Sequence, residues 1–349
     1  MEAAINWPEP ARHGLYEASS QYRNWRFSDA QLADLRERTS RAVMETTCAA
    51  FERDVPGSSA SLEFPTPQEE LALVRFYAAK IGQICSVFRF GEEVEATGVV
   101  YLKRFYMKHT VMTHHPKNVM LTALFLAAKT CNRPVSIADF VKGIPKTTED
   151  DVLSLEFPVA QSLNFEFAVW HAHRALWGIF LDAQTLDPPP ASDELQAAYN
   201  IAIAIVRKSR LTDVDALYTP AQIAYAAWHR ASSELATLWL TAKEKRGVEV
   251  DATAVALIAI LQHIDEYGDP PSVERVRDID RRLKLCRNPE TIPGSRAYLR
   301  RQAEHEALIA AKRKRKAEKA RAEMEEDEDP FGGGGGGAIG ANREVTMRA

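Results

Sequence analysis

The sequence predicts an all-α protein built from two successive five-helix bundles, with extra helices at both ends of the chain. The first observation is a pair of helices between Val99 and Cys131, where apolar residues recur at positions i, i+3, i+4 and i+7 from Leu121. Residues 119–128 carry no charge, and a helix that is apolar most of the way round lies at the centre of a bundle. The second observation is that the helix pattern restarts at His171. A second apolar helix, uncharged at its centre, then begins at Thr219, roughly 100 residues after the first.

Length and composition suit a globular protein of two ordinary domains. The chain has 349 residues, of which 46% are hydrophobic and 26% are charged. The formal net charge is −4, which argues against a protein whose main role is to coat nucleic acid, because such proteins usually contain a strongly basic domain. Four cysteines occur without a CxxC pair, so we expect free thiols in a reducing compartment.

No targeting or membrane segment is apparent. The first residues lack a basic stretch followed by an apolar run, so we expect no secretory signal. The longest uncharged run that we single out, Ala252 to Ile264, is shorter than the roughly 20 apolar residues that span a bilayer. We therefore expect a protein without a membrane partner.

The N-terminal segment and the first bundle follow from capping residues and apolar faces. Ser28 is a candidate N-cap of a helix that continues through Cys48, and Trp25 and Phe27 just before it are candidate anchors onto the main body. The first bundle begins at Thr66, with two acidic residues in the opening turn, where they suit the helix dipole. Its predicted helices are residues 67–88, the central pair, residues 137–143 after the cap Ser136, and residues 149–163 after the cap Thr148.

The second bundle and the C-terminal region are predicted in the same way. The second bundle comprises helices at residues 175–183, 193–210, 219–232, 236–245 and 252–266. Two further helices follow, one at 272–285 with an apolar face and one at 296–326 that is charged almost all round. Gly332 to Ala349 contains a glycine run and is predicted to be a flexible tail.

These patterns give a five-part division of the chain. We predict an N-terminal segment with a helix, a first bundle, a second bundle, C-terminal helices and a flexible tail. Their bounds are residues 1–65, 66–168, 169–268, 269–328 and 329–349.

A search for catalytic chemistry yields no candidate. The sequence contains no GxGxxG, P-loop, HExxH or nucleophile-elbow motif. The two histidine clusters, His114-His115 and His171-x-His173, lack cysteine or carboxylate partners at ligand spacing. We therefore expect a protein that is not an enzyme and has neither a metal nor a cofactor.

Two charged residues lie in unusual places. Lys129 ends the most apolar helix of the first bundle, and Glu156 lies on the apolar stripe of the helix at 149–163. Taken alone, Lys129 could complement the helix dipole and extend to water, and Glu156 could be a solvated carboxylate at the stripe edge. A second interpretation, a polar pair at an interface, is left open by the residues themselves.

The ordered motifs carry a family resemblance. YLKRFY is followed by an apolar helix ending in LAAK and by an acidic amphipathic helix ending in LNF, and SSQYRNWRF and SVERVRDIDRRLKLC flank the two bundles. Together these motifs resemble the cyclin family, and within it the regulatory cyclins of the general transcription factor IIH kinase module. The resemblance runs in order from about Ser19 to Cys286 and implies two tandem cyclin boxes.

The resemblance implies a regulatory subunit that binds and activates a cyclin-dependent kinase and promotes phosphorylation of the RNA polymerase II C-terminal repeats. Implied partners are the kinase, a RING-containing assembly factor and the remainder of transcription factor IIH, in the nucleus. Lys129 and Glu156 stand at positions that contact the kinase in cyclins, and we add Phe157, Trp25 and Phe27 as candidate kinase-binding residues.

The sequence also departs from the family pattern. ThrCysAsn follows Lys129 where many cyclins have an acidic pair, and Pro158 inside the fifth helix predicts a kink that affects how Glu156 is presented. The MRAIL pattern, by which cell-cycle cyclins dock substrates, is absent from the first helix of the bundle.

Alternatives remain both for the function of the chain and for the role of its basic run near residue 314. The chain could be another transcriptional cyclin, or a transcription-factor-IIB-like DNA-binding double cyclin fold, although the acidic net charge leads us to expect no direct nucleic-acid contact. The basic run Lys312 to Lys316 is either a nuclear import signal or one part of a charged helix surface.

Overall fold

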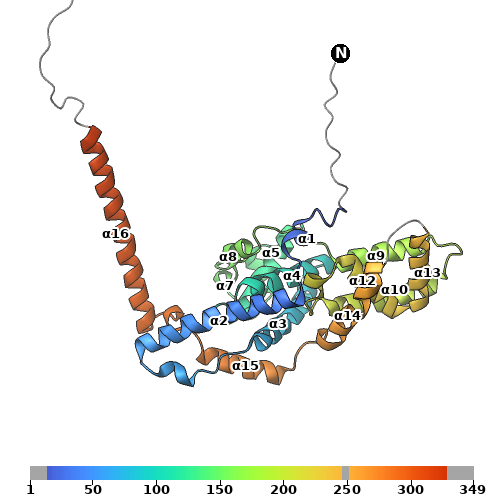
Figure 1. Cartoon of the computed structure of the whole chain (residues 1–349), viewed down its shortest axis with the longest axis horizontal. Helices are drawn as coiled ribbons and strands as arrows, with labels where there is room; N and C mark the ends of the chain where they lie inside the picture. The colour runs from blue at the N-terminus through green and yellow to red at the C-terminus, as the bar shows by residue number, and fades with distance from the viewer. Residues whose placement is uncertain (1–13, 246–250, 328–349) are drawn as a thin grey trace, which may run out of the picture. The chain divides into compact units, whose positions relative to one another are not determined.

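The computed structural model describes residues 14–245 and 251–327, except for the side chains of residues 251–255 and 322–327. The predicted tail, Gly332 to Ala349, lies outside the described residues. All regular secondary structure in the described part is helical, which confirms the predicted fold class (Figure 1). The chain divides into two compact units, residues up to Asn288 and residues from Pro289 onward.

The first repeat consists of helices that follow the predicted order. They are α3 (Pro67–Phe88), α4 (Glu92–Lys108), α5 (Pro116–Thr130), α6 (Ile137–Lys142), α7 (Glu149–Leu153) and α8 (Glu156–Ser162). Side-chain caps explain several of the starts, because an N-cap oxygen satisfies an amide that has no partner within its helix. Ser136 caps α6 and Thr148 caps α7, as predicted.

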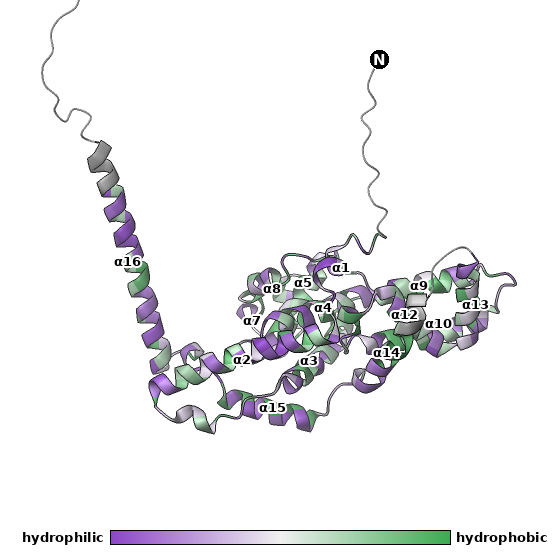
Figure 2. Cartoon of the chain, viewed as in Figure 1, coloured by the Kyte–Doolittle hydropathy of each residue, from purple (hydrophilic) through white to green (hydrophobic). Residues whose placement is uncertain are grey.

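Helix α5 is the centre of this repeat. Every residue from Val119 to Ala128 is buried, which confirms the prediction from its lack of charge. It packs against α3, α4, α7 and α8. Gly98 of α4 faces Leu124 of α5 at this contact, and a Cβ there would lie 3.5 Å from the Leu124 Cα, an ordinary van der Waals distance. Figure 2 shows the green, hydrophobic character of these inner helices.

The second repeat is built in the same way around another buried helix. Its elements are α9 (Ala172–Ala183), α10 (Ser192–Ser209), α11 (Val214–Leu217), α12 (Pro220–Ala231), α13 (Ser233–Glu244) and α14 (Asp251–Tyr267). Helix α12 contacts α9, α10, α13 and α14, and its Trp228 is fully buried. The short helix α11 was not predicted from the sequence.

Additional helices pack on the two repeats. They are α1 (Ser20–Asn24), α2 (Asp29–Asp54), the 3₁₀ turn η1 (Ser58–Ser61) and α15 (Val273–Leu285). Ser28 caps α2 with a capping box, as predicted. Val276, Ile279 and Leu283 of α15 join the hydrophobic core of the first repeat.

One described helix, α3, is long and apolar enough by length and composition to cross a membrane. Its residues Leu73 and Ile81 are fully buried in the first repeat, so the apolar character of α3 serves the core of that repeat.

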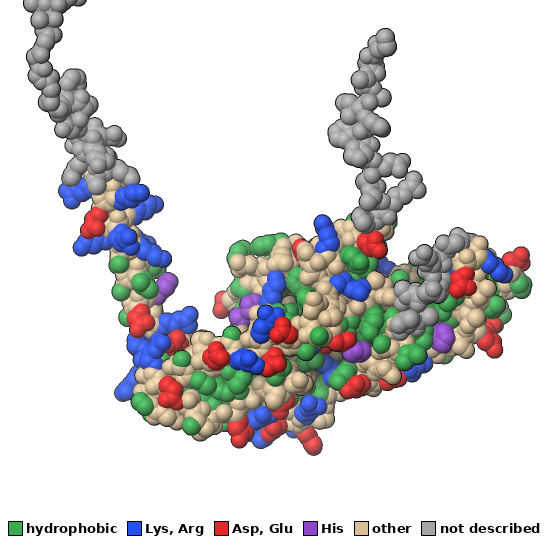
Figure 3. Space-filling model, viewed as in Figure 1, with side chains coloured by type: hydrophobic (Ala, Val, Ile, Leu, Met, Phe, Trp, Pro, Cys, Tyr) green, Lys and Arg blue, Asp and Glu red, His purple; other side chains and the backbone are tan. Residues whose placement is uncertain are grey.

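The second unit contains η2 (Pro289–Thr291) and α16 (Arg296–Asp327). All side chains from residue 301 to residue 321 are exposed, including the basic run Lys312 to Lys316. The purple colour of α16 in Figure 2 and its many blue side chains in Figure 3 show the same polar character. Both interpretations of the basic run are compatible with this exposure.

Candidate functional site

Lys129 lies in the last turn of α5, where a cation complements the negative end of the helix dipole. Its ammonium nitrogen lies 4.3 Å from the centroid of the Phe125 ring. The aliphatic part of the side chain therefore covers apolar surface of α5, while the charged end reaches solvent. The side chain is 40% exposed.

The predicted fifth helix is two short helices. We expected one helix up to about Leu163 with a kink at Pro158, but α7 ends at Leu153 and α8 begins at Glu156. Pro158 therefore lies in the first turn of α8, where its missing N–H would have no partner within the helix in any case. The predicted disruption by Pro158 is confirmed as a break between two helices at Ser154 and Leu155, because the proline ring clashes with the helical carbonyl one turn earlier, at Ser154.

This break presents Glu156 at the start of α8, where its carboxylate suits the positive end of the helix dipole. The Lys129 ammonium donates to the Glu156 Oε1 atom at 2.5 Å, and the Glu156 side chain is 26% exposed. The structure therefore joins the two charges to each other in the free chain. A pair exposed to this degree stabilises the free protein by about 1 kcal/mol at most.

Two exposed phenylalanines accompany the ion pair. Phe157 is 66% exposed, Phe165 is 55% exposed, and their ring centroids are 6.1 Å apart. Leu153 at the end of α7 is 41% exposed. Large apolar side chains grouped on a surface mark interaction sites. We call Lys129, Leu153, Glu156, Phe157 and Phe165 the first-repeat face; Figure 3 shows hydrophobic side chains over this edge of the molecule.

Phe165 was not identified from the sequence. It follows Asn164, and both residues have positive φ, 54° for Asn164 and 59° for Phe165. A bulky residue with positive φ is strained, and such strain concentrates at functional sites. The sequence feature that could have identified Phe165 is the preceding Leu163-Asn164 pair. Asparagine tolerates the left-handed conformation that ends a helix, and this conformation directs the next residue outward.

Trp25 lies inside the molecule and does not belong to the first-repeat face. It is 3% exposed and packs with Leu32, Met107, Ala216 and Leu217. Its indole N–H donates to Glu166 at 2.6 Å, and the Arg104 guanidinium lies 4.7 Å from the ring centroid. Burial lowers the pKa of Arg104 to about 10. Of the two roles that we considered for Trp25, packing on the body is the one that this geometry supports.

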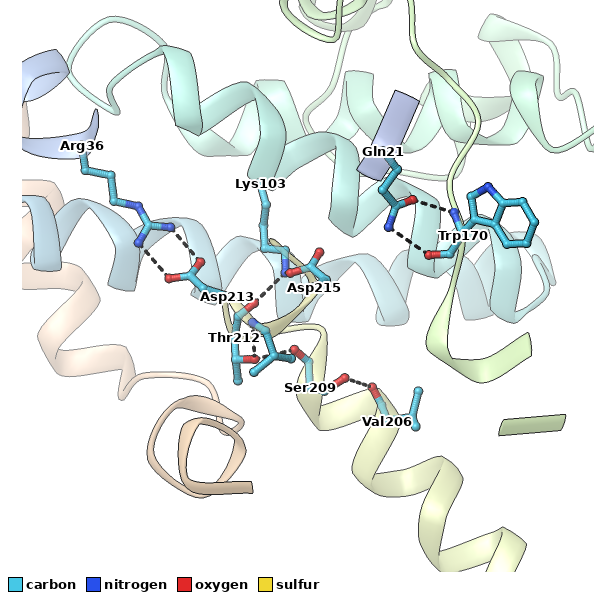
Figure 4. A network of polar contacts seen from close by, with 10 residues as sticks. Gln21, Arg36, Lys103, Trp170, Val206, Ser209, Thr212, Asp213 and Asp215 are labelled. Atoms are coloured by element: carbon cyan, nitrogen blue, oxygen red, sulfur yellow. Dashed lines mark hydrogen bonds and ion pairs between the residues drawn. The ribbon is translucent and has the colours of Figure 1, made fainter. Parts of the chain in front are cut away.

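Phe27 is half-buried beside the same cluster, and its backbone N–H donates to the Ala216 carbonyl at 2.9 Å. Neighbouring contacts connect α1 to the segment that links the repeats, and α2 to the loop between α10 and α11 of the second repeat (Figure 4). Gln21 exchanges two hydrogen bonds with the backbone of Trp170, and Arg36 forms two hydrogen bonds with Asp213 at 2.7 and 2.8 Å. Trp25 and Phe27 thus lie at the junction of the repeats.

No catalytic or metal-binding arrangement accompanies the first-repeat face. In the part of the chain that the structure describes, no group of three or more His, Cys, Asp or Glu residues could hold a metal ion. His171 of the second histidine cluster is buried, and its Nε2 lies 2.8 Å from the Thr97 hydroxyl. Burial keeps its pKa well below the usual value, so this histidine is neutral and structural.

Comparison with known proteins places this geometry in a family. The model of the cyclin N-terminal domain matches residues 71–168, and that of the cyclin C-terminal domain matches residues 171–267. The chain is 30% identical to cyclin mcs2 of Schizosaccharomyces pombe over 300 residues, which cover 84% of this chain and 91% of that protein.

Two solved structures are similar over most of the fold. A chain in the structure of the CAK complex from Chaetomium thermophilum bound to ATP-γ-S has a TM-score of 0.73 and 30% identity, covering 84% of this chain and 94% of that one. A chain in the yeast TFIIK (Kin28/Ccl1/Tfb3) complex has a TM-score of 0.60 and 30% identity, covering 71% of this chain and all of that one.

Proposed function

This chain belongs to the cyclin family, and from this premise we propose that it is the regulatory cyclin of the general transcription factor IIH kinase module. In this role it binds and activates a cyclin-dependent kinase and promotes phosphorylation of the RNA polymerase II C-terminal repeats. The similarity to chains of the CAK and TFIIK complexes over most of the fold supports the proposal.

The observation that carries the kinase-binding role is the first-repeat face. Two exposed aromatic rings beside a half-exposed ion pair form the kind of apolar centre with a polar rim that protein interfaces use. We propose that the kinase covers Phe157 and Phe165 and orders its αC helix against them. Activation follows when αC brings its glutamate to the catalytic lysine and the metal-binding segment takes its active position.

The remaining partners extend the proposal. Kin28 and Tfb3 are named with Ccl1 in the yeast TFIIK complex, and we infer a kinase and a RING-containing assembly factor as the corresponding partners here. Association with the remainder of transcription factor IIH and a nuclear location follow from the same inference. The chain itself contributes no catalytic group in this scheme, because the kinase supplies the reaction centre.

The test is affinity purification of the native protein, identification of the co-purifying kinase, and reconstitution of that kinase with increasing amounts of the full chain. We expect saturable activation toward a peptide of RNA polymerase II C-terminal repeats. Recovery of no kinase, or a recovered kinase that is equally active without the chain, would refute the proposal.

A further inference from the structure

A groove on the second repeat lies where α9 and α10 pack on each other, beside the start of α4 (Figure 1). Its volume is about 910 Å³, which is within the range of ligand-binding clefts. None of its lining residues belongs to the first-repeat face, so the groove is separate from the proposed kinase contact. We call it the Trp177 groove; it is lined by Glu92, His173, Arg174, Trp177, Tyr199, Asn200, Ile203 and Arg207.

Trp177 is the largest apolar group of the groove, and its neighbours hold it in one orientation. Its ring stacks on Phe180, with ring centroids 5.2 Å apart and an interplanar angle of 27°. It also meets Tyr199 edge to face, at 5.5 Å and 73°. Phe180 is buried, whereas Trp177 remains 47% exposed. Because its neighbours already fix the indole, a partner that packs on the exposed part loses little side-chain entropy.

The charged side chains of the groove are already paired within the chain. Glu92 forms an ion pair with Arg207 at 2.8 Å, and both line the groove. Arg174 forms an ion pair with Glu93 at 2.6 Å. Burial lowers the pKa of His173 to about 4, so this histidine is neutral at pH 7. The groove therefore offers no unpaired charge and suits an uncharged ligand.

Two uncharged polar groups of the groove offer hydrogen-bond donors. The indole N–H of Trp177 has no hydrogen-bond partner in the part of the chain that the structure describes. The Asn200 side chain is exposed, and its carbonyl oxygen already accepts from Gln196 at 3.0 Å, which leaves its amide N–H groups for a ligand. A matching segment must supply acceptors beside an apolar surface. Proline does both, because its residue has a ring and a carbonyl but no N–H.

The recurring ways in which proteins bind peptides narrow the choice further. Addition of a strand needs a sheet edge, and all regular secondary structure in the described chain is helical. A bound helix needs apolar contacts along about 10 Å, from position i to i+7. The apolar wall here is one compact group, in which Tyr199 and Ile203 are a single turn apart on α10 beside Trp177. An aromatic groove of this kind is the type that recognises proline-rich segments in the polyproline II conformation.

We propose that the Trp177 groove binds an uncharged, proline-rich segment of a partner protein in the polyproline II conformation. A proline ring packs on the exposed part of Trp177, and carbonyls of the segment accept hydrogen bonds from the Trp177 indole and the Asn200 amide. A polyproline II segment has no internal hydrogen bonds and is extended before it binds. Its carbonyls are therefore available, and little conformational entropy is lost on binding.

The test measures retention of two degenerate pools of uncharged peptides on the immobilised full chain, without kinase. One pool has a fixed Pro-x-x-Pro core, and in the other both prolines are alanine. We expect the proline pool to be retained about 10-fold more strongly, and Trp177→Ala to abolish this difference, since aromatic anchors contribute on that scale. Trp170→Ala is the matched control, because Trp170 is 44% exposed and does not line the groove. It should preserve the difference.

Asn200→Ala provides a second variant at an exposed position, where folding is not at risk, and should weaken retention of the proline pool by about 5-fold. The melting temperature of Trp177→Ala shows whether the loss of stacking on Phe180 unfolds that variant. Equal retention of the two pools by the wild-type chain would overturn the proposal. Equal losses in Trp177→Ala and Trp170→Ala would overturn it too, by showing attraction to any exposed tryptophan.

A further arm removes residues 1–13, which contain Pro8 and Pro10. Equal retention of the proline pool by the full and the shortened chain would support the proposal. Retention by the shortened chain alone would show that the N-terminal segment of the chain itself occupies the groove, and would overturn the assignment to a partner protein. Kinase activation by Trp177→Ala should be unchanged, which keeps this test separate from that of the proposed function.

Discussion

The two repeats end their central helices with the same kind of ion pair. In the first repeat, Lys129 of α5 binds Glu156 of α8 at 2.5 Å, with side chains 40% and 26% exposed. In the second repeat, Arg230 of α12 binds Asp265 of α14 at 2.7 Å, with side chains 44% and 60% exposed. A cation in the last turn is favoured by the helix dipole in both. The ion pair by itself therefore does not mark a partner site.

The surroundings of the two pairs differ. Phe157 and Phe165 stand beside the first pair and are mostly exposed. The cavity beside Arg230 is lined by Ala231, two serines, His229, Glu234 and two leucines of α14, and no Phe, Tyr or Trp of the described structure lines it. Because aromatic anchors dominate interface energetics, we propose that the kinase binds the first-repeat face and not the surface around Arg230.

The fifth helix of each repeat explains this difference. Helix α14 is continuous from Asp251 to Tyr267, whereas its counterpart breaks into α7 and α8. A break starts a new helix at Glu156 and gives Phe157 a position in an exposed first turn. The interruption of this helix thus places an exposed aromatic side chain, Phe157, beside the ion pair of the first repeat.

The largest expected effect concerns the junction that holds the repeats in one body. Trp25→Ala should lower the free energy of unfolding by about 3–5 kcal/mol, because it leaves a cavity among buried side chains of α2, α4 and α11. Chemical denaturation of the full chain measures this loss. Tyr22→Ala, at a position 39% exposed on α1, is the control and should change little.

A loss below about 1 kcal/mol for Trp25→Ala would contradict the structural role. The same reasoning bears on deletion of Met1 to Cys48. The deletion also removes Leu32 and Arg36, which contact the rest of the body, so we expect it to destabilise the remaining chain. Any loss of kinase activation must therefore be compared with the melting temperature of the truncated chain.

The second prediction tests the aromatic side chains that distinguish the repeats. Phe157→Ala with Phe165→Ala should weaken kinase binding by about 3 kcal/mol, because hot-spot aromatics contribute on this scale. Stability should hardly change, since both rings are exposed. A binding titration with the purified kinase measures the effect. Ile258→Ala on α14, 63% exposed in the free chain, is the matched control in the second repeat.

If the double phenylalanine variant binds the kinase with unchanged affinity, the first-repeat face is not the kinase-binding site. An equal loss of kinase affinity in Ile258→Ala would show that the kinase covers both repeats, so that the first-repeat face would not be distinctive.

The third prediction compares the two ion pairs directly. Lys129→Ala and Glu156→Ala should each weaken kinase binding by about 2 kcal/mol, because the kinase desolvates the pair and leaves the remaining charge without its partner. Arg230→Ala and Asp265→Ala should leave binding unchanged. A double-mutant cycle on affinity and on melting temperature separates coupling within the pair from contact with the kinase. Similar losses of kinase affinity for the variants of both ion pairs would contradict the proposed difference between the two repeats.

The smallest effect concerns a charged contact between the repeats. Burial of Glu92 on α4 raises its pKa, but hydrogen bonds and charges from Arg207 on α10 and from Arg210, just after that helix, outweigh this and lower the pKa to about 2. A lowered carboxyl pKa stabilises the fold above the pKa of the unfolded chain, near 4.5, and that stability is lost as pH falls toward 2. Glu92→Gln should therefore cost about 1 kcal/mol at pH 7.

The difference between Glu92→Gln and the wild type should shrink as pH falls from 5 to 3, which thermal unfolding across that range measures. A difference that stays constant with pH would show that Glu92 acts through packing and not through its charge.

Much of the fold could be predicted because its signals are local. The lack of charge in residues 119–128 indicated a buried helix, and the positions of Ser28, Ser136 and Thr148 indicated helix starts, all of which the structure confirms. A helix repeats every few residues, so its buried face and its caps are written in neighbouring positions. The same local reasoning identified Lys129 and Glu156 as unusual charges on apolar helices.

Only the tertiary structure decided which candidates share a surface. It joins Lys129 to Glu156, 27 residues apart, and adds Phe165, while it buries Trp25 against Glu166, 141 residues away. It also shows that the disruption expected from Pro158 is a break at Ser154 and Leu155, directly before Glu156. The reason is physical: periodicity fixes which face of a helix is apolar, but packing between helices decides which parts of that face meet another helix and which remain for a partner.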